Sequence, residues 1–143
     1  MALHRILKAP LLAVALSAVA LLFGCENPSS MNEDSANVKH ITQADFSNEV
    51  TRCPLPVAVE FYATWCAPCR QEVPLLDQVA GNYTGKIKFV KVNIDESPGL
   101  AQNYEVQAVP LLILFKDGNL VERLMGLQTE TNLTAKLNGL VGK

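Results

Sequence analysis

The chain has 143 residues, of which 49% are hydrophobic and 18% are charged, and its formal net charge is −2. This composition is that of a globular protein and is too apolar for a disordered chain. The length allows one domain. A slightly acidic chain without a block of basic residues argues against a nucleic-acid partner.

The first 24 residues are typical of a secretion signal. Arg5 and Lys8 precede the apolar run Leu11–Phe23, in which Ser17 is the only polar side chain. A membrane span needs about 20 apolar residues, and this run is shorter. We therefore expect residues 1–24 to be a signal peptide, with an uncleaved signal anchor as the alternative.

The end of this segment, Leu22-Phe23-Gly24-Cys25, resembles the lipobox of bacterial lipoproteins. The resemblance implies a lipid on Cys25, and its acyl chains would hold the protein on a membrane, facing the periplasm or the cell exterior. A disulfide role for Cys25 is the alternative. Residues 25–37 are almost all polar after the cysteine, so we expect a flexible tether there.

Residues 38–143 follow, and their apolar patterns predict alternating strands and helices. The segment Val57–Tyr62 is nearly all apolar, which predicts a buried strand. A helix is expected to begin at Thr42, because Asp45 follows three residues later. The other expected strands are 38–41, 87–94, 111–116 and 120–125, and the other expected helices are 67–82, 98–104 and 129–141.

The order of these elements predicts an α/β fold. Alternation through the first three strands favours parallel pairing with right-handed crossovers. Asp117-Gly118-Asn119 lies between the last two strands, which indicates an antiparallel hairpin with a tight turn. We expect a mixed sheet with helices on both faces.

Two cysteines, in the motif Cys66-Ala67-Pro68-Cys69, come directly after the buried strand and open a helix. Residues three apart share a helix face, so their Cα atoms would lie about 5–6 Å apart, within disulfide range. The helix amino terminus favours the Cys66 thiolate, which attacks disulfides. Cys69, one turn deeper, would then resolve the mixed disulfide. Pro68 is tolerated in a first helical turn.

Cysteines in this motif also have other uses in proteins. Zinc usually needs four ligands, and the remaining candidates in the mature chain are only Cys25, Cys53 and His40. We expect no metal and no bound cofactor. A purely structural Cys66–Cys69 disulfide remains an alternative, and Cys53 is either a bystander or a partner for intermolecular or regulatory pairing.

The segment Phe61–Arg70 resembles the active-site segment of thioredoxins. Further matches occur in the same order at Pro74, Lys91–Asp95, Val109-Pro110, Phe115–Gly118 and Gly126, while Ala67 stands where thioredoxins typically have Gly. Residues 38–143 are thus identified as a member of the thioredoxin family. The resemblance implies a thioredoxin fold, with a mixed central sheet of about five strands and about four flanking helices.

The resemblance also implies roles for residues around the two cysteines. It makes Cys66 the nucleophile and Cys69 the resolving cysteine. It makes Val109–Pro110 a cis peptide, with substrate backbone pairing with Val109. We expect Trp65, Ala67, Pro68, Val109 and Pro110 to form the substrate-binding surface, with a place in the core as the alternative for Trp65.

Glu60 is the one charged residue in the buried strand. Burial of a lone carboxylate is costly and raises its pKa, so this carboxyl could take and return the proton of a nearby thiol. Thioredoxins carry Asp at the matching place, and Lys91 matches the lysine that approaches it. The alternatives are that Glu60 faces water and that Lys91 is a solvated strand lysine.

The predicted function is reduction of protein disulfides outside the cytoplasm by the Cys66/Cys69 dithiol. The resemblance implies a membrane electron carrier that returns the protein to its reduced state. A disulfide-forming oxidase of the same fold and a tethered binding module without redox turnover are the alternatives. We expect a monomer.

Overall fold

The computed structural model describes residues 35–142 of the chain. The expected signal peptide, the expected lipid site at Cys25 and the tether up to residue 34 lie outside the described residues. The end of the predicted tether is described, and there Asn37 lies against a helix of the domain. None of the helices within residues 35–142 has the length and apolarity to cross a membrane.

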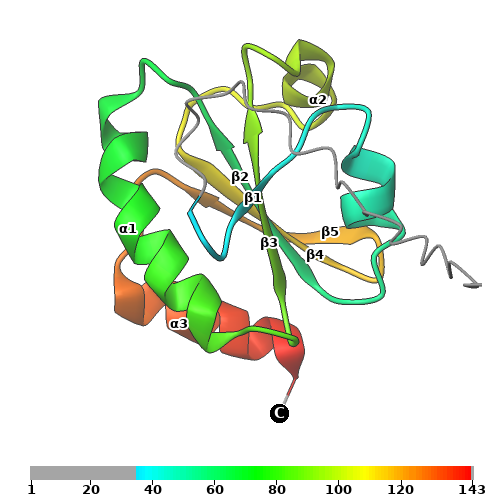
Figure 1. The fold of residues 1–143 in the computed structure, drawn as a ribbon, viewed down its shortest axis with the longest axis vertical. Helices are drawn as coiled ribbons and strands as arrows, with labels where there is room; N and C mark the ends of the chain where they lie inside the picture. The colour runs from blue at the N-terminus through cyan, green and yellow to red at the C-terminus, as the bar shows by residue number, and fades with distance from the viewer. Residues whose placement is uncertain (1–34, 143) are drawn as a thin grey trace, which may run out of the picture. The chain divides into compact units, whose positions relative to one another are not determined.

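The core of the fold is a five-stranded sheet with the order β1-β3-β2-β4-β5 (Figure 1). Both β1 and β2 run parallel to β3, while β4 runs antiparallel to β2 and to β5. This confirms the predicted mixed sheet and its carboxy-terminal hairpin. The strands are β1 (Lys39–His40), β2 (Val57–Tyr62), β3 (Lys88–Asn93), β4 (Leu111–Lys116) and β5 (Asn119–Met125).

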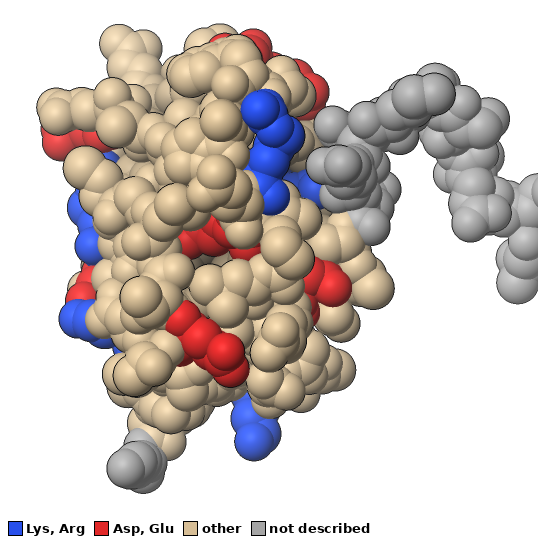
Figure 2. All heavy atoms as spheres, turned by 90° about the vertical axis from the view of Figure 1, so that its left-hand side faces the viewer, with Lys and Arg blue, Asp and Glu red and all other residues tan. Residues whose placement is uncertain are grey.

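Helices cover both faces of the sheet, as predicted. On one face lie α1 (Ala67–Asn82) and α3 (Glu130–Val141), and on the other lie the π-helix η1 (Ser47–Thr51) and α2 (Pro98–Asn103) (Figure 1). Figure 2 shows the side of the domain on which α1 lies, with Asp and Glu atoms visible near its centre and Lys and Arg mostly toward its edges.

The alternation of side chains along β2 decides what each face contains. Val57, Val59 and Phe61 pack under η1 and α2, while Ala58 packs under α1 and α3. Because β2 is covered on both faces, its sequence is apolar at nearly every position. The same alternation places Glu60 on the α1 side, between the two layers.

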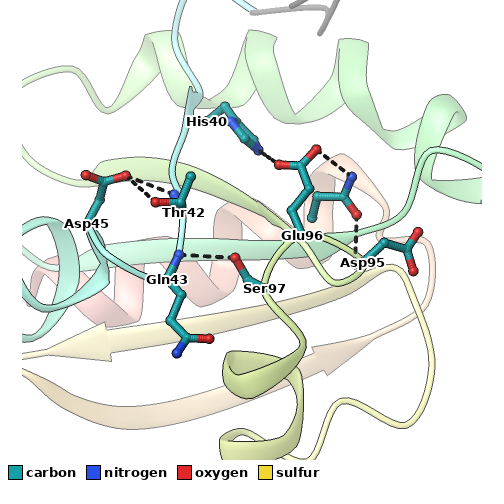
Figure 3. A network of polar contacts seen from close by, with 8 residues as sticks. His40, Thr42, Gln43, Asp45, Asp95, Glu96 and Ser97 are labelled. Atoms are coloured by element: carbon teal, nitrogen blue, oxygen red, sulfur yellow. Dashed lines mark hydrogen bonds and ion pairs between the residues drawn. The ribbon is translucent and has the colours of Figure 1, made fainter.

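The structure differs from the sequence prediction at Thr42, where a helix was expected to begin. The Asp45 carboxylate accepts hydrogen bonds from the Thr42 N–H at 3.0 Å and from its hydroxyl at 2.8 Å (Figure 3). These bonds close a turn over residues 42–45, so η1 is a single π-helical turn that begins at Ser47. Short polar side chains that bond the nearby backbone compete with helix formation in this way.

The hairpin turn explains why a glycine stands at position 118. Asp117 and Gly118 both have positive φ, at 52° and 76°. A Cβ on Gly118 would lie 2.4 Å from the carbonyl oxygen of Thr51, at the end of η1. Glycine therefore permits both the backbone conformation and the close approach.

Candidate active site

The redox pair lies where β2 leads into α1. Cys66 is the N-cap residue of α1, and its Sγ accepts a hydrogen bond from the Cys69 N–H at 3.1 Å. The two residues form a disulfide with a Cα–Cα distance of 5.3 Å, in the predicted range. The N–H groups of a helix amino terminus stabilise negative charge, so this position favours a Cys66 thiolate in the reduced protein.

Apolar groups surround the disulfide. Both cysteines are buried, and Ala63, Tyr62 and Val109 pack against them. The Val109–Pro110 peptide bond is cis, as the resemblance implied, and the buried Pro110 accepts a hydrogen bond from the Gly126 N–H at 2.9 Å. The polypeptide around Val109 is therefore held directly beside the two sulfurs.

Trp65, Ala67 and Pro68 lie on the surface beside the disulfide. The Trp65 side chain is 65% exposed, so the alternative of a core residue is wrong. Its indole N–H donates to the Asp95 carboxylate at 2.9 Å. A large apolar ring held at the surface next to Cys66 provides contact area for a protein substrate.

A polar network fixes the loop that carries Asp95 (Figure 3). The Asp95 N–H donates to the Asn93 side-chain oxygen at 3.0 Å, and the Asn93 amide donates to Glu96 at 3.1 Å. The other Glu96 oxygen lies 3.2 Å from Nε2 of His40 in β1. Sequence reasoning missed this positioning of Trp65, although Asp95 stands in a segment that matched the family.

Glu60 is buried, with 2% of its surface exposed, so the alternative that it faces water is wrong. Its neighbours in the sheet are Lys91 on β3 and Leu112 on β4. Burial raises the pKa of the Glu60 carboxyl from 4.5 to about 7, the Glu72 carboxylate adds to the rise, and the Lys91 ammonium opposes it. Oε1 of Glu60 has no hydrogen-bond partner within the described residues.

Lys91 is buried as well, so it is not a solvated strand lysine. It stands opposite Glu60 in the β2–β3 register, and its Nζ lies 5.7 Å from the centre of the Tyr62 ring. The structure thus brings the predicted carboxyl and the predicted lysine to the same face of the sheet.

Glu72 is a second buried carboxyl, and sequence reasoning missed it. It lies on α1 with 3% of its surface exposed and accepts a hydrogen bond from the Gln128 N–H at 3.2 Å. Burial raises the pKa of Glu72, and the hydrogen bond partly opposes the rise. The helical spacing contained a signal, because Glu72 lies three residues after Cys69 and four before Leu76, both on the buried side of α1.

Cys53 and His40 are not among the residues that pack around Cys66 and Cys69. Cys53 is free and half-buried, and it packs against the core beneath η1 and α2. His40 contacts Glu96, as described above. In the part of the chain from 35 to 142, no three His, Cys, Asp or Glu side chains are grouped to bind a metal ion.

The fold and the site together define a class of protein. A disulfide at the amino terminus of a helix, next to a cis-proline that precedes an inner strand of a mixed five-stranded sheet, is the redox site of a thiol–disulfide oxidoreductase with a thioredoxin fold.

Comparison with known proteins agrees with this class. The thioredoxin family profile matches residues 37–139. Thioredoxin 1 of Synechococcus elongatus is 41% identical over 98 residues, which cover 68% of this chain and 92% of the relative. Thioredoxin of Pseudomonas aeruginosa is 39% identical over 104 residues, which cover 73% of this chain and 96% of the relative. The chain belongs to the thioredoxin family and has its protein-disulfide reductase activity.

Proposed function

We propose that this protein reduces protein disulfides outside the cytoplasm, tethered to a membrane by a lipid on Cys25. The observation that carries the redox part is the Cys66 sulfur at the N-cap of α1, bonded to Cys69 and accepting its N–H. The extracytoplasmic part rests on the sequence of residues 1–37, in which a signal-like segment ends at a lipobox-like cysteine.

In the first step the reduced protein attacks its client. The Cys66 thiolate forms a bond to one sulfur of the client disulfide, and the client S–S bond breaks. The second client sulfur leaves with the electron pair of that bond and takes a proton from water. The product is a mixed disulfide between Cys66 and the client.

In the second step Cys69 releases the client. Its thiol loses a proton, and the thiolate attacks the Cys66 sulfur, so the Cys66–Cys69 bond forms and the mixed disulfide breaks. The client leaves as a thiolate and is protonated. In total the client gains two electrons and two protons, and the Cys66/Cys69 pair loses two electrons.

Glu60 is the proposed acceptor of the Cys69 proton, directly or through water. A carboxyl with a pKa of about 7 is present in both protonation states near neutral pH. Such a group can both take and return a proton. Lys91, opposite Glu60 in the register, is the proposed cation that keeps this pKa from rising further.

The client is proposed to bind along the surface next to Cys66. Its backbone would pair with Val109 beside the cis-proline Pro110, and its side chains would contact Trp65, Ala67 and Pro68. These residues surround the disulfide, and three of them are exposed.

The oxidised pair must be reduced again after each cycle. A protein outside the cytoplasm has no NADPH at hand, so the proposed donor is a dithiol of a membrane electron carrier. Two electrons pass to the Cys66–Cys69 disulfide, and the donor becomes oxidised.

Cysteine variants test the redox part of the proposal with insulin as the disulfide substrate. Cys66→Ser is expected to abolish reduction, and Cys69→Ser to accumulate a mixed disulfide through Cys66, visible by mass spectrometry. Cys53→Ser is the matched control, because Cys53 is free and lies apart from the redox pair; it should keep full activity. Activity in Cys66→Ser, or adducts formed through Cys53, would contradict the assignment.

Mass spectrometry of the mature amino terminus tests the tether. We expect the chain to begin at Cys25 with acyl chains attached, and Cys25→Ser to leave the membrane fraction. A mature chain with an unmodified Cys25 would refute the lipid anchor and leave the redox proposal standing.

A further inference from the structure

The described chain begins with a short segment, residues 35–38, that we call the strap. Ser35 and Val38 form an isolated β-bridge, and the Ser35 hydroxyl donates to the Val38 carbonyl at 3.4 Å. The strap thus turns back on itself immediately before β1. In Figure 1 it is the cyan turn that precedes β1.

Two hydrogen bonds attach the strap to α1. The Asn37 N–H donates to the Asp77 carboxylate at 2.8 Å, and the Asn37 side-chain amide donates to the Asp77 carbonyl at 3.2 Å. One turn further along α1, a Cβ on Gly81 would lie 3.4 Å from the Asn37 amide nitrogen, which is an ordinary contact distance. The Asn37 side chain therefore lies close against α1 from Asp77 to Gly81.

The strap borders a small cavity between the sheet and α1 that has no room for a water molecule. Its Ser35 and Val38 face this cavity. The other walls are Glu60 and Lys91 from the sheet and Val73 and Leu76 from α1. Val38 itself is buried in the core under α1. The strap is thus the outer wall next to the buried carboxyl.

We propose that Asn37 and Asp77 are positioning residues, which hold the strap as a cover that keeps water away from Glu60. They act on the exchange reaction only through this carboxyl, so the inference rests on the proposed proton transfer by Glu60. If the bonds to Asp77 are lost, the strap moves away and water reaches the cavity. Hydration then favours the ionised carboxylate.

The charges that face Glu60 do not come from the strap. Lys91 approaches from β3 and Glu72 from α1, while the β4 neighbour Leu112 is apolar. The strap contributes only Ser35 and Val38 to the cavity. The predicted effect of the strap on Glu60 is therefore exclusion of water, and an experiment can distinguish this effect from that of a nearby charge.

The test is the titration of the Glu60 carboxyl, followed by carbon-13 NMR in the oxidised full-length chain and assigned with Glu60→Gln. The double variant Asn37→Ala with Asp77→Ala removes both bonds of the strap, and we expect the Glu60 midpoint to fall by roughly 1 pH unit. Asn37→Ala alone removes one bond and should give a smaller fall.

Two control variants distinguish the exclusion of water by the strap from the effect of removing a carboxylate charge. Asp77→Asn removes the charge but keeps an oxygen that can accept the Asn37 N–H, so the midpoint should stay unchanged. Asp45→Ala removes a carboxylate that accepts a backbone N–H at Thr42, away from the cavity, and should also leave it unchanged.

An unchanged Glu60 midpoint in the double variant would overturn the inference. An equal fall in Asp77→Asn would overturn it too, because charge and not water exclusion would then be responsible. If the midpoint falls as expected but the pH profile of disulfide reduction does not follow it, the cover stands and the proposed proton transfer by Glu60 fails.

Discussion

Glu60 makes the stability of the oxidised domain depend on pH in a direction that can be calculated. Its pKa is 4.5 in ordinary surroundings and about 7 in the folded protein. Between these values the folded chain holds a proton that the unfolded chain has lost. This contribution to stability is fully present below pH 4.5 and is lost as the pH rises through 7.

The magnitude follows from the two pKa values. One pKa unit corresponds to about 1.4 kcal/mol, so the free energy of unfolding should decrease by about 2–3 kcal/mol between pH 5 and pH 8 because of this carboxyl. Glu60→Gln keeps the shape of the side chain and cannot ionise. Relative to the wild type, the variant should therefore gain about 2–3 kcal/mol of stability over the same interval.

Urea denaturation of both oxidised proteins at pH 5, 6, 7 and 8 measures this difference. Other titrating groups are common to both proteins, so they largely cancel in the comparison. A pH-independent effect of the amide on stability is the same at every pH, so the informative quantity is the change with pH of the difference in free energy of unfolding. A difference that stays constant from pH 5 to pH 8, or that changes in the opposite direction, would refute a buried carboxyl with a raised pKa.

Two more predictions concern Glu72 and two glycines at positive φ. Glu72→Gln removes a charge that raises the pKa of Glu60, so the Glu60 midpoint in carbon-13 NMR should fall; a rise would contradict the coupling. Gly118→Ala and Gly85→Ala both place a side chain at positive φ, but only at Gly118 would the new Cβ meet another atom within 4 Å. In urea denaturation Gly85→Ala should cost about 1–2 kcal/mol and Gly118→Ala clearly more, and equal costs would contradict the close approach.

The parts of the fold that could be predicted are those that short local sequence patterns determine. The nearly apolar segment Val57–Tyr62 indicates a strand covered on both faces, and this pattern favoured burial of the single carboxyl within it. Cys66 and Cys69 stand at the change from strand to helix, where spacing alone brings the sulfurs together. These features need no knowledge of distant residues.

The parts that could not be predicted depend on contacts between distant residues or on competition between local ones. The spacing of Glu72 on α1 indicated its buried side, but its hydrogen bond with Gln128, 56 residues later, could not be predicted, since a charged helix residue normally faces water. Asn37 donates a hydrogen bond to Asp77, 40 residues later, so the end of the polar segment that was predicted to be a tether lies against α1. Around Thr42, the Asp45 carboxylate formed a turn where the pattern predicted a helix start.

The reduction potential of the Cys66–Cys69 pair tests the central claim most directly. The full-length chain is equilibrated with buffers of reduced and oxidised glutathione, and the two redox states are separated by thiol alkylation and mass spectrometry. A protein-disulfide reductase should show a potential more negative than that of the glutathione couple, with the disulfide persisting in moderate excess of reduced glutathione. A potential at or above that of glutathione would contradict the reductase and favour a disulfide-forming oxidase.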